Sequence, residues 1–237
     1  MRRSFAPWFS VRYDMKTLSA KIIITSLPFV LLLGCKHSTE PDTSQANYSP
    51  LNTGDQLQLV NLADSSTQFF TVLGNQLRQD GLVIFAVQEK IGTFAADTVF
   101  RFIRDGYLIA TQIDSVTPFS LPGNPYAESR IAKLNPTDGD SWIEELSSSD
   151  TVTVTVSSVP TLTTICSTFQ NVFALTSTQH TNGQTFVTGP EYYANLIGLV
   201  GYDAQYLGRH FQWRAVYIKS GNTEMGSPWP AKQFLPL

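Results

Sequence analysis

The sequence predicts an all-β fold of antiparallel strands, arranged as a strongly curled sheet, a half-barrel or a sandwich, with at most short helices. Short runs of alternating or β-branched residues recur along the chain from residue 51, and tight-turn dipeptides separate several of them. No alternation of strands and helices indicates a parallel sheet. The windows 138–146 and 191–196 have some helical character, but each is too short to form an independent helix.

The clearest predicted element is a hairpin in which the runs 98–104 and 107–113 flank Asp105-Gly106. An Asp-Gly dipeptide between two β-rich runs favours a two-residue turn, because both turn positions need a positive φ. That turn places four large side chains on one face, namely Phe100, Phe102, Tyr107 and Ile109. The opposite face is also largely apolar, so we expect both faces to be covered, or one of them to line a cavity.

Other strands are predicted where β-branched and aromatic residues dominate. These runs are 56–62, 68–73, 82–89, 130–134, 151–157, 168–178, 184–187 and 210–218. Valine and threonine alternate over residues 151–156, so we expect these valines to point inward. Asn182-Gly183 marks a second tight turn. Glycine and proline crowd the stretch 220–237, which is predicted to be an irregular tail that packs on the domain through residues such as Trp229.

The N-terminal segment has the pattern of an export signal. Two basic residues, Lys16 and Lys21, precede an apolar run at 22–33, whose 12 residues are fewer than the roughly 20 needed to span a membrane. The sequence Leu32-Leu33-Gly34-Cys35 then resembles the lipobox of bacterial lipoproteins. The resemblance implies cleavage between Gly34 and Cys35 and attachment of a lipid to the Cys35 thiol, which would anchor the chain to a membrane.

The predicted organisation of the chain follows from that cleavage site. Residues 1–34 are the expected signal peptide, with Met15 as the expected true start. Residues 35–50 are mostly small and polar and are expected to form a flexible tether, which the β domain follows at 51–219. Lys36, rather than an aspartate, comes directly after the cysteine. By the sorting rule of enteric bacteria, this predicts export to the outer membrane.

The composition excludes nucleic acid as a partner and limits the cysteine chemistry. Five of the 16 basic and one of the 19 acidic residues precede Cys35, so the mature chain has 11 basic and 18 acidic residues and a formal charge of −7. A chain this acidic lacks the basic patch that a phosphate backbone requires. Cys166 is the second of two cysteines, and we expect a buried, inert thiol there. A reactive or intermolecular thiol is the alternative.

Three motifs in the second half of the chain carry a further resemblance. They are Gly139-Asp140-Ser141-Trp142, the run 168–172 (Thr-Phe-Gln-Asn-Val) and the run 191–200 (Glu-Tyr-Tyr-Ala-Asn-Leu-Ile-Gly-Leu-Val). Together they resemble the signature of uncharacterised exported lipoproteins common in Bacteroidota, over about residues 135–218, although Ser167 replaces an expected glycine. The resemblance implies an all-β, antiparallel fold, and it supplies no catalytic residues.

The residues of these motifs are predicted to be structural. Gly139-Asp140 is typical of a turn. Gly198 and Gly201 predict a bulge or a close approach of two backbones within a strand. Tyr192 and Tyr193 should point to opposite faces of an extended strand, so that one lies in the core and the other at the surface.

The sequence contains no recognisable catalytic or metal-binding constellation, and we predict no cofactor. The histidines are far apart along the chain and have no ligand nearby in sequence: His37, His180 and His210. Acid–base catalysis needs two carboxyl groups held across a substrate. The pairs Asp138/Asp140 and Glu144/Glu145 are too close in sequence for this and are expected to be solvated. We therefore expect that the chain is not an enzyme.

Three functional hypotheses follow. The preferred one is a non-catalytic binding or scaffolding module of the cell envelope, which contacts an envelope protein or a glycan. The second is a carrier of a lipid or other hydrophobic ligand on the surface formed by Phe100, Phe102, Tyr107 and Ile109, which an apolar cavity would favour. The third is a hydrolase with a dispersed site, which would require a cleft that brings His210 next to carboxylates.

Overall fold

The computed structural model describes residues 51–111, 128–145, 150–181, 184–206 and 208–229. All regular secondary structure in this part of the chain is β, which confirms the predicted all-β class. The strands are β1 (Gln56–Asn61), β2 (Thr67–Leu77), β3 (Val83–Ile91), β4 (Asp97–Arg104), β5 (Tyr107–Thr111), β6 (Ser129–Lys133), β7 (Ser141–Glu145), β8 (Asp150–Thr163), β9 (Thr168–Thr181), β10 (Gln184–Val187), β11 (Glu191–Ala194), β12 (Gly198–Tyr206), β13 (Arg209–Ser220) and β14 (Thr223–Gly226). The described residues include no helix long and apolar enough to cross a membrane.

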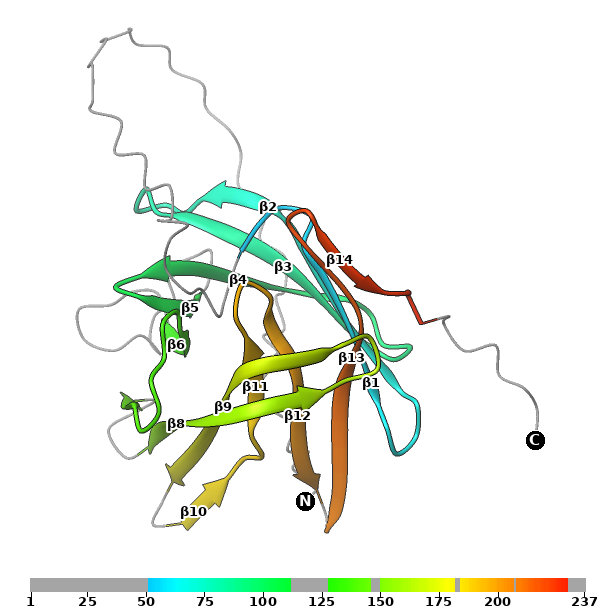
Figure 1. Ribbon diagram of the computed structural model, residues 1–237. Coiled ribbons are helices and arrows are strands. Elements are labelled where there is room, and N and C mark those ends of the chain that lie inside the picture. Colours follow the sequence, from blue (N-terminus) through cyan, green and yellow to red (C-terminus); the bar gives the residue numbers. More distant parts are fainter. Residues whose placement is uncertain (1–50, 112–127, 146–149, 182–183, 207, 230–237) are drawn as a thin grey trace, which may run out of the picture. The chain divides into compact units, whose positions relative to one another are not determined.

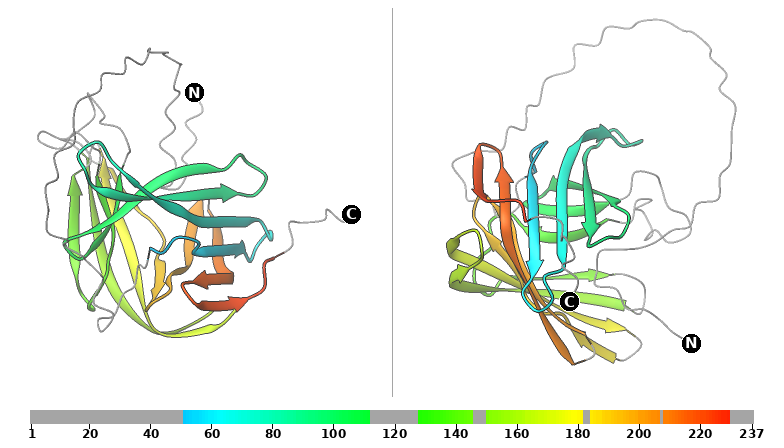
Figure 2. Two further views of the ribbon diagram at one scale, coloured as in Figure 1. Left: turned by 90° about the horizontal axis from the view of Figure 1, so that it is seen from above. Right: turned by 90° about the vertical axis from the view of Figure 1, so that its right-hand side faces the viewer.

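The fourteen strands form a single antiparallel sheet. Its order is β6-β5-β4-β3-β2-β1-β13-β12-β11-β9-β8-β7, with β10 beside β9 and β14 beside β13. The first six strands are therefore a simple meander, and β1 joins it to the second half of the chain through β13. Figures 1 and 2 show that the sheet curls strongly, so that the meander lies over the strands of the second half.

The curling brings the two ends of the sheet together. No hydrogen-bonded ladder joins β6 to β7 within the described residues, but side chains connect the two ends. Leu108 of β5 shares a core cluster with Trp142 of β7. The Tyr107 and Trp142 rings meet edge to face with their centroids 5.5 Å apart. Lys133 Nζ lies 2.7 Å from Asp140 Oδ2. The sheet is therefore nearly closed, and side chains rather than backbone hydrogen bonds complete it.

Apolar side chains from both halves of the sheet fill most of its inner face. The largest cluster joins residues of the meander with residues of β9 and β11 to β13: Leu59, Phe70, Val72, Val87, Phe169, Val172, Ala194, Val200, Ala215 and Ile218. Burial of each large aliphatic or aromatic side chain contributes about 1.5–3 kcal/mol. In β8 the predicted alternation is confirmed, because Val152, Val154 and Val156 are all buried.

The hairpin of β4 and β5 forms in the predicted register. Phe102 lies opposite Ile109 and Phe100 lies opposite Thr111. The turn residues Asp105 and Gly106 have φ values of 53° and 76°, as a two-residue turn with two positive φ positions requires. The second predicted turn, Asn182-Gly183, lies outside the described residues.

Two predictions of local structure were wrong. The windows 138–146 and 191–196 contain strands β7 and β11 rather than helical segments. Each window is short, and pairing with long neighbouring strands decided its conformation in the folded chain.

The stretch 220–237 was predicted to be irregular, yet Thr223–Gly226 forms strand β14 against β13. Packing of Trp229 is confirmed, because its backbone N–H donates to Gln58 Oε1 over 2.7 Å.

Some of the structural features predicted for the motifs of the second half are present. The β11–β12 ladder has a bulge between Tyr192 and Tyr193. Tyr193 is buried, and Tyr192 is half-buried and also packs on a core cluster. A Cβ on Gly201 would lie 2.5 Å from the Trp213 carbonyl oxygen, so the two backbones approach too closely for any side chain there. In β9, Asn171 adopts a φ of 53°, a left-handed conformation that asparagine tolerates better than most residues.

Candidate functional site

The predicted lipidation site lies outside the described residues. Cys35 and the cleavage position at Gly34 belong to the segment 1–50. Cleavage and lipidation therefore stay predictions from the sequence. Cys166, which was predicted to be a buried and inert thiol, is half-buried and unpaired. Burial raises the pKa of its thiol, which keeps it in the less reactive protonated form.

The surface predicted to hold a hydrophobic ligand is largely filled by the protein itself. Phe102 and Ile109 are 1% and 5% exposed and pack with Ile84. The guanidinium groups of Arg78 and Arg104 lie 5.5 Å and 5.1 Å from the centre of the Phe102 ring. Phe100 and Tyr107 pack against the same cluster and are half-buried. A hydrophobic ligand at this surface stays a prediction.

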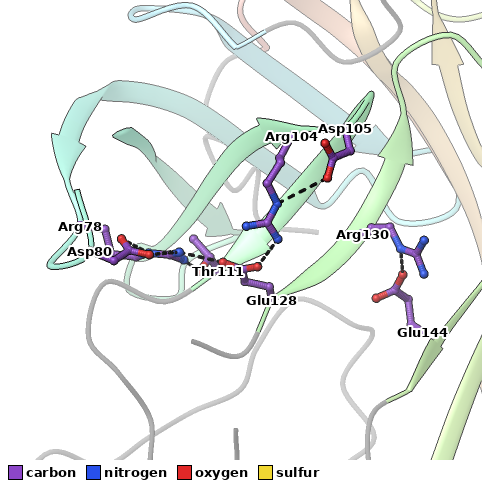
Figure 3. A network of polar contacts seen from close by, with 8 residues as sticks. All are labelled: Arg78, Asp80, Arg104, Asp105, Thr111, Glu128, Arg130 and Glu144. Carbon is purple, nitrogen blue, oxygen red and sulfur yellow. Dashed lines mark hydrogen bonds and ion pairs between the residues drawn. The ribbon is translucent and has the colours of Figure 1, made fainter. Parts of the chain in front are cut away.

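Arg78 and Arg104, which lie over the Phe102 ring, belong to an ionic network that is drawn in Figure 3. Arg78 is buried, with its Nη2 2.7 Å from Asp80 Oδ2 and 2.8 Å from Glu128 Oε1, and its Nη1 donates to Thr111. Arg104 forms an ion pair with the same Glu128. The hydrogen bond from Arg78 is the largest cause that lowers the pKa of Asp80, to about 2. Asp80 therefore stays ionised beside Arg78 at neutral pH.

A shallow recess of about 230 Å³ opens beside this network. Its lining includes Arg104, Tyr107, Glu128, Arg130 and Glu144, and the last two form an ion pair. Ligand pockets are commonly about 300–1,000 Å³ in volume. The recess is smaller than that range, and its charged groups are paired with one another, so it offers little to bind more than a small polar group.

A second polar cluster lies on the inner face of the curled sheet. Glu89 of β3 shares its face with the core residue Val87, and Arg101 of β4 shares its face with Val99, which packs on the same core. Across the sheet, Glu191 of β11 lies directly opposite Tyr202 of β12. We refer to Gln68, Glu89, Arg101, Glu191, Tyr193 and Tyr202 as the inner-face cluster.

Short polar contacts join the members of this cluster in pairs. Arg101 Nη2 lies 2.6 Å from Glu89 Oε1. The Tyr193 hydroxyl donates to Glu191 Oε2 over 2.9 Å. The Tyr202 hydroxyl donates to Gln68 Oε1 over 2.8 Å. The cluster thus contains one ion pair, between Arg101 and Glu89, and a second carboxylate, Glu191, that feels the charge of Arg101 without contacting it. The buried Nε–H of Arg101 has no hydrogen-bond partner.

Burial dominates the titration of these groups. Desolvation raises the pKa of Glu89, and the nearby Arg101 opposes the rise. Desolvation also raises the pKa of Glu191, against a hydrogen bond from Tyr193. The pKa values of Tyr193 and Tyr202 are raised by burial first and then by the charge of Glu191. Such perturbed groups gathered on one face are typical of functional sites.

Sequence reasoning did not find the inner-face cluster, because its members are far apart along the chain. The spacing of apolar and charged residues along strands β3 and β4 did indicate part of this cluster. Val87-Gln88-Glu89 and Val99-Phe100-Arg101 each place a charged residue two positions after an apolar one, on the same face. Charged residues at such inward positions are rare unless they are paired or functional.

The other residues considered from the sequence have structural surroundings. His180 and His210 are exposed, and the described residues contain no group of ligands that could hold a metal ion. Asp138 accepts a hydrogen bond from the Ser158 backbone. Hydrogen bonds from Lys133 and then Thr137 lower the pKa of Asp140 to about 2. The carboxylate pair at 138 and 140 therefore stabilises a turn.

Comparison with known proteins gives little further information. No protein-family model matches the chain, and no curated protein sequence matches it. One solved structure, described as a candidate lipoprotein of Parabacteroides distasonis, is similar with a TM-score of 0.40 and 12% sequence identity, over 72% of this chain and 96% of that chain. A likeness of this degree establishes neither a shared fold nor a shared function.

Proposed function

We propose that this chain is an exported lipoprotein, anchored to the bacterial envelope through lipid on Cys35, with a non-catalytic β domain that binds a ligand or partner. The observation that carries the anchoring is the sequence Leu32-Leu33-Gly34-Cys35 behind a short apolar run. The outer membrane is the proposed location because Lys36 follows the cysteine. The proposed partner is a glycan or another envelope protein.

The inner-face cluster supports a binding role for the β domain. Removing a charged side chain from water costs several kcal/mol even when it is paired, so an interior built only for packing would use apolar residues. Glu89 and Arg101 are instead placed on the same inner face as the apolar core. The apolar part of that face is covered by side chains from both halves of the sheet that pack on one another, which favours binding of a polar group at the charged positions over carriage of a long apolar one.

Labelling of cells with radioactive palmitate tests the anchor. We expect the wild-type protein to be labelled and its processing to be blocked by globomycin, which inhibits the lipoprotein signal peptidase. The Cys35→Ser variant should accumulate as an unlabelled and uncut precursor, because its hydroxyl does not accept the lipid. Cys166→Ser serves as the matched control and should be labelled like the wild type.

Two results would contradict the proposed anchor. Label retained by Cys35→Ser would place the lipid elsewhere, and label lost from Cys166→Ser would place it on the other cysteine. Membrane fractionation of the labelled protein tests the location separately. Recovery in the inner-membrane fraction would contradict the assignment that rests on Lys36 while leaving the anchor itself intact.

A further inference from the structure

We propose that the inner-face cluster binds a neutral sugar through neighbouring hydroxyl groups. The inference rests on the proposed binding function and names its ligand. The cluster leaves two hydrogen-bonding groups without full partners. The buried Arg101 Nε–H has no acceptor, while Glu191 receives a hydrogen bond from Tyr193 and forms no ion pair with the described residues. One free donor and one uncompensated acceptor thus occur in the same cluster.

A ligand with several hydroxyl groups satisfies both of these needs. A hydroxyl group accepts a hydrogen bond through its oxygen and donates one through its proton, so one hydroxyl can accept from Arg101 and a neighbouring one can donate to Glu191. Neighbouring hydroxyl groups on a sugar ring extend the same pattern to Glu89 and to the Tyr202 oxygen. A buried donor left without a partner costs free energy, and this ligand removes that cost.

The charges of the cluster argue against ionic ligands. Arg101 is already neutralised by Glu89 at 2.6 Å, so an anion would meet a compensated guanidinium and would be repelled by Glu191. A simple cation would neutralise Glu191 but has no acceptor for the Arg101 Nε–H. A neutral ligand that carries both donors and acceptors fits the observed set of groups.

Part of the cluster is accessible to solvent. The Arg101 side chain is 15% exposed, and Glu191 and Tyr202 also keep some accessible surface. The Tyr202 ring is stacked on Trp213, with 5.6 Å between centroids. Sugars present an apolar C–H face as well as hydroxyl groups, and aromatic rings with a polar handle suit such ligands.

Exposed aliphatic side chains continue the same face away from the cluster. Val83 and Ile103, which lie two residues from Phe85 and Arg101 on their strands, share the inner face with them. Leu77 lies directly opposite Val83. Their exposed fractions are 68% for Leu77, 50% for Val83 and 41% for Ile103. This row could contact an alkyl chain attached to the sugar, so the sugar has two possible sources, a free glycan and a glycolipid headgroup.

Titration of the full-length lipoprotein with sugars tests the inference. The protein is kept in lauryldimethylamine oxide, a detergent without a sugar headgroup, and saturation-transfer NMR measures binding of glucose, galactose, mannose and N-acetylglucosamine. Octyl glucoside below its micellar concentration serves as the glycolipid probe. We expect at least one free sugar to bind, and tighter binding of octyl glucoside would indicate the glycolipid source.

Conservative variants locate the site. Arg101→Lys keeps the positive charge beside Glu89 but removes the Nε–H, and Glu191→Gln removes the uncompensated acceptor charge. Each should weaken sugar binding about 10- to 100-fold, the loss expected for a hydrogen bond to a charged group. Arg104→Lys, in the outer recess, is the matched control and should bind like the wild type. Thermal melting verifies that each variant is folded.

Three outcomes would overturn the inference. The first is that no sugar binds, and the second is that Arg104→Lys weakens binding while Arg101→Lys does not, which would move the site to the outer recess. The third is that tetramethylammonium binds at the cluster and the sugars do not, which would make it a cation site. None of these outcomes affects palmitate labelling at Cys35, so the anchor and the ligand can fail independently.

Discussion

At the scale of single residues, Glu191 is a carboxyl group whose charge the fold disfavours. It lies on the inner face, it accepts a hydrogen bond from the Tyr193 hydroxyl, and burial raises its pKa above the ordinary value of 4.5. The folded protein therefore binds this proton more tightly than the unfolded chain. The resulting stabilisation is complete below pH 4.5 and is lost as the pH rises through the raised pKa.

Glu191→Gln should reduce this loss of stability. We expect the melting temperature of the wild type to fall as the pH rises above 4.5, and that of the variant to fall less, because glutamine has no proton to lose. Once Glu191 is ionised, the variant should be the more stable of the two. Calorimetry at a series of pH values measures the difference, and Glu224→Gln controls for removal of an exposed charge. Parallel pH profiles for wild type and Glu191→Gln would contradict the assignment.

At the scale of elements, the turn between β4 and β5 is the feature with the strictest requirement on backbone conformation. Gly106 has a φ of 76°, which a β-branched side chain resists. Gly106→Val should destabilise the domain by about 1–3 kcal/mol, and each kcal/mol lowers the melting temperature of a domain this size by about 2–4 °C. Asp105→Asn is the control, since Asn-Gly favours the same turn. An unchanged melting temperature for Gly106→Val would contradict the tight turn.

Elements defined by local signals were predictable, whereas those defined by their neighbours were not. The β4–β5 register follows from Asp105-Gly106 and from strand alternation, both of which are local. Strands β7 and β11 depend on long partners such as β8 and β9, which a short window does not contain. The inner-face cluster is harder still, because the pairing of β11 with β12 and the curl of the sheet bring Glu191 towards Glu89 and Arg101.

At the scale of the whole domain, closure of the sheet depends on side chains between its two ends. Strands β6 and β7 are the terminal strands of the hydrogen-bonded order. The edge-to-face contact of Tyr107 with Trp142 connects β5 to β7, and both residues belong to the second core cluster or pack on it. These tertiary contacts connect the two ends of the sheet. Their removal should therefore make unfolding of the domain less cooperative.

A double-mutant cycle measures this closure directly. Tyr107→Leu and Trp142→Leu each remove one ring, and the coupling energy between them should be about 0.5–1.5 kcal/mol, the value typical of aromatic pairs. Denaturant unfolding of the wild type, both single variants and the double variant gives the four free energies. Tyr107→Leu combined with Trp213→Leu is the control, because Trp213 packs on the other core cluster, and residues without shared partners are additive within about 0.3–0.5 kcal/mol. A coupling between Tyr107 and Trp142 no larger than that of the control pair would mean that the two ends of the sheet are not held together in solution.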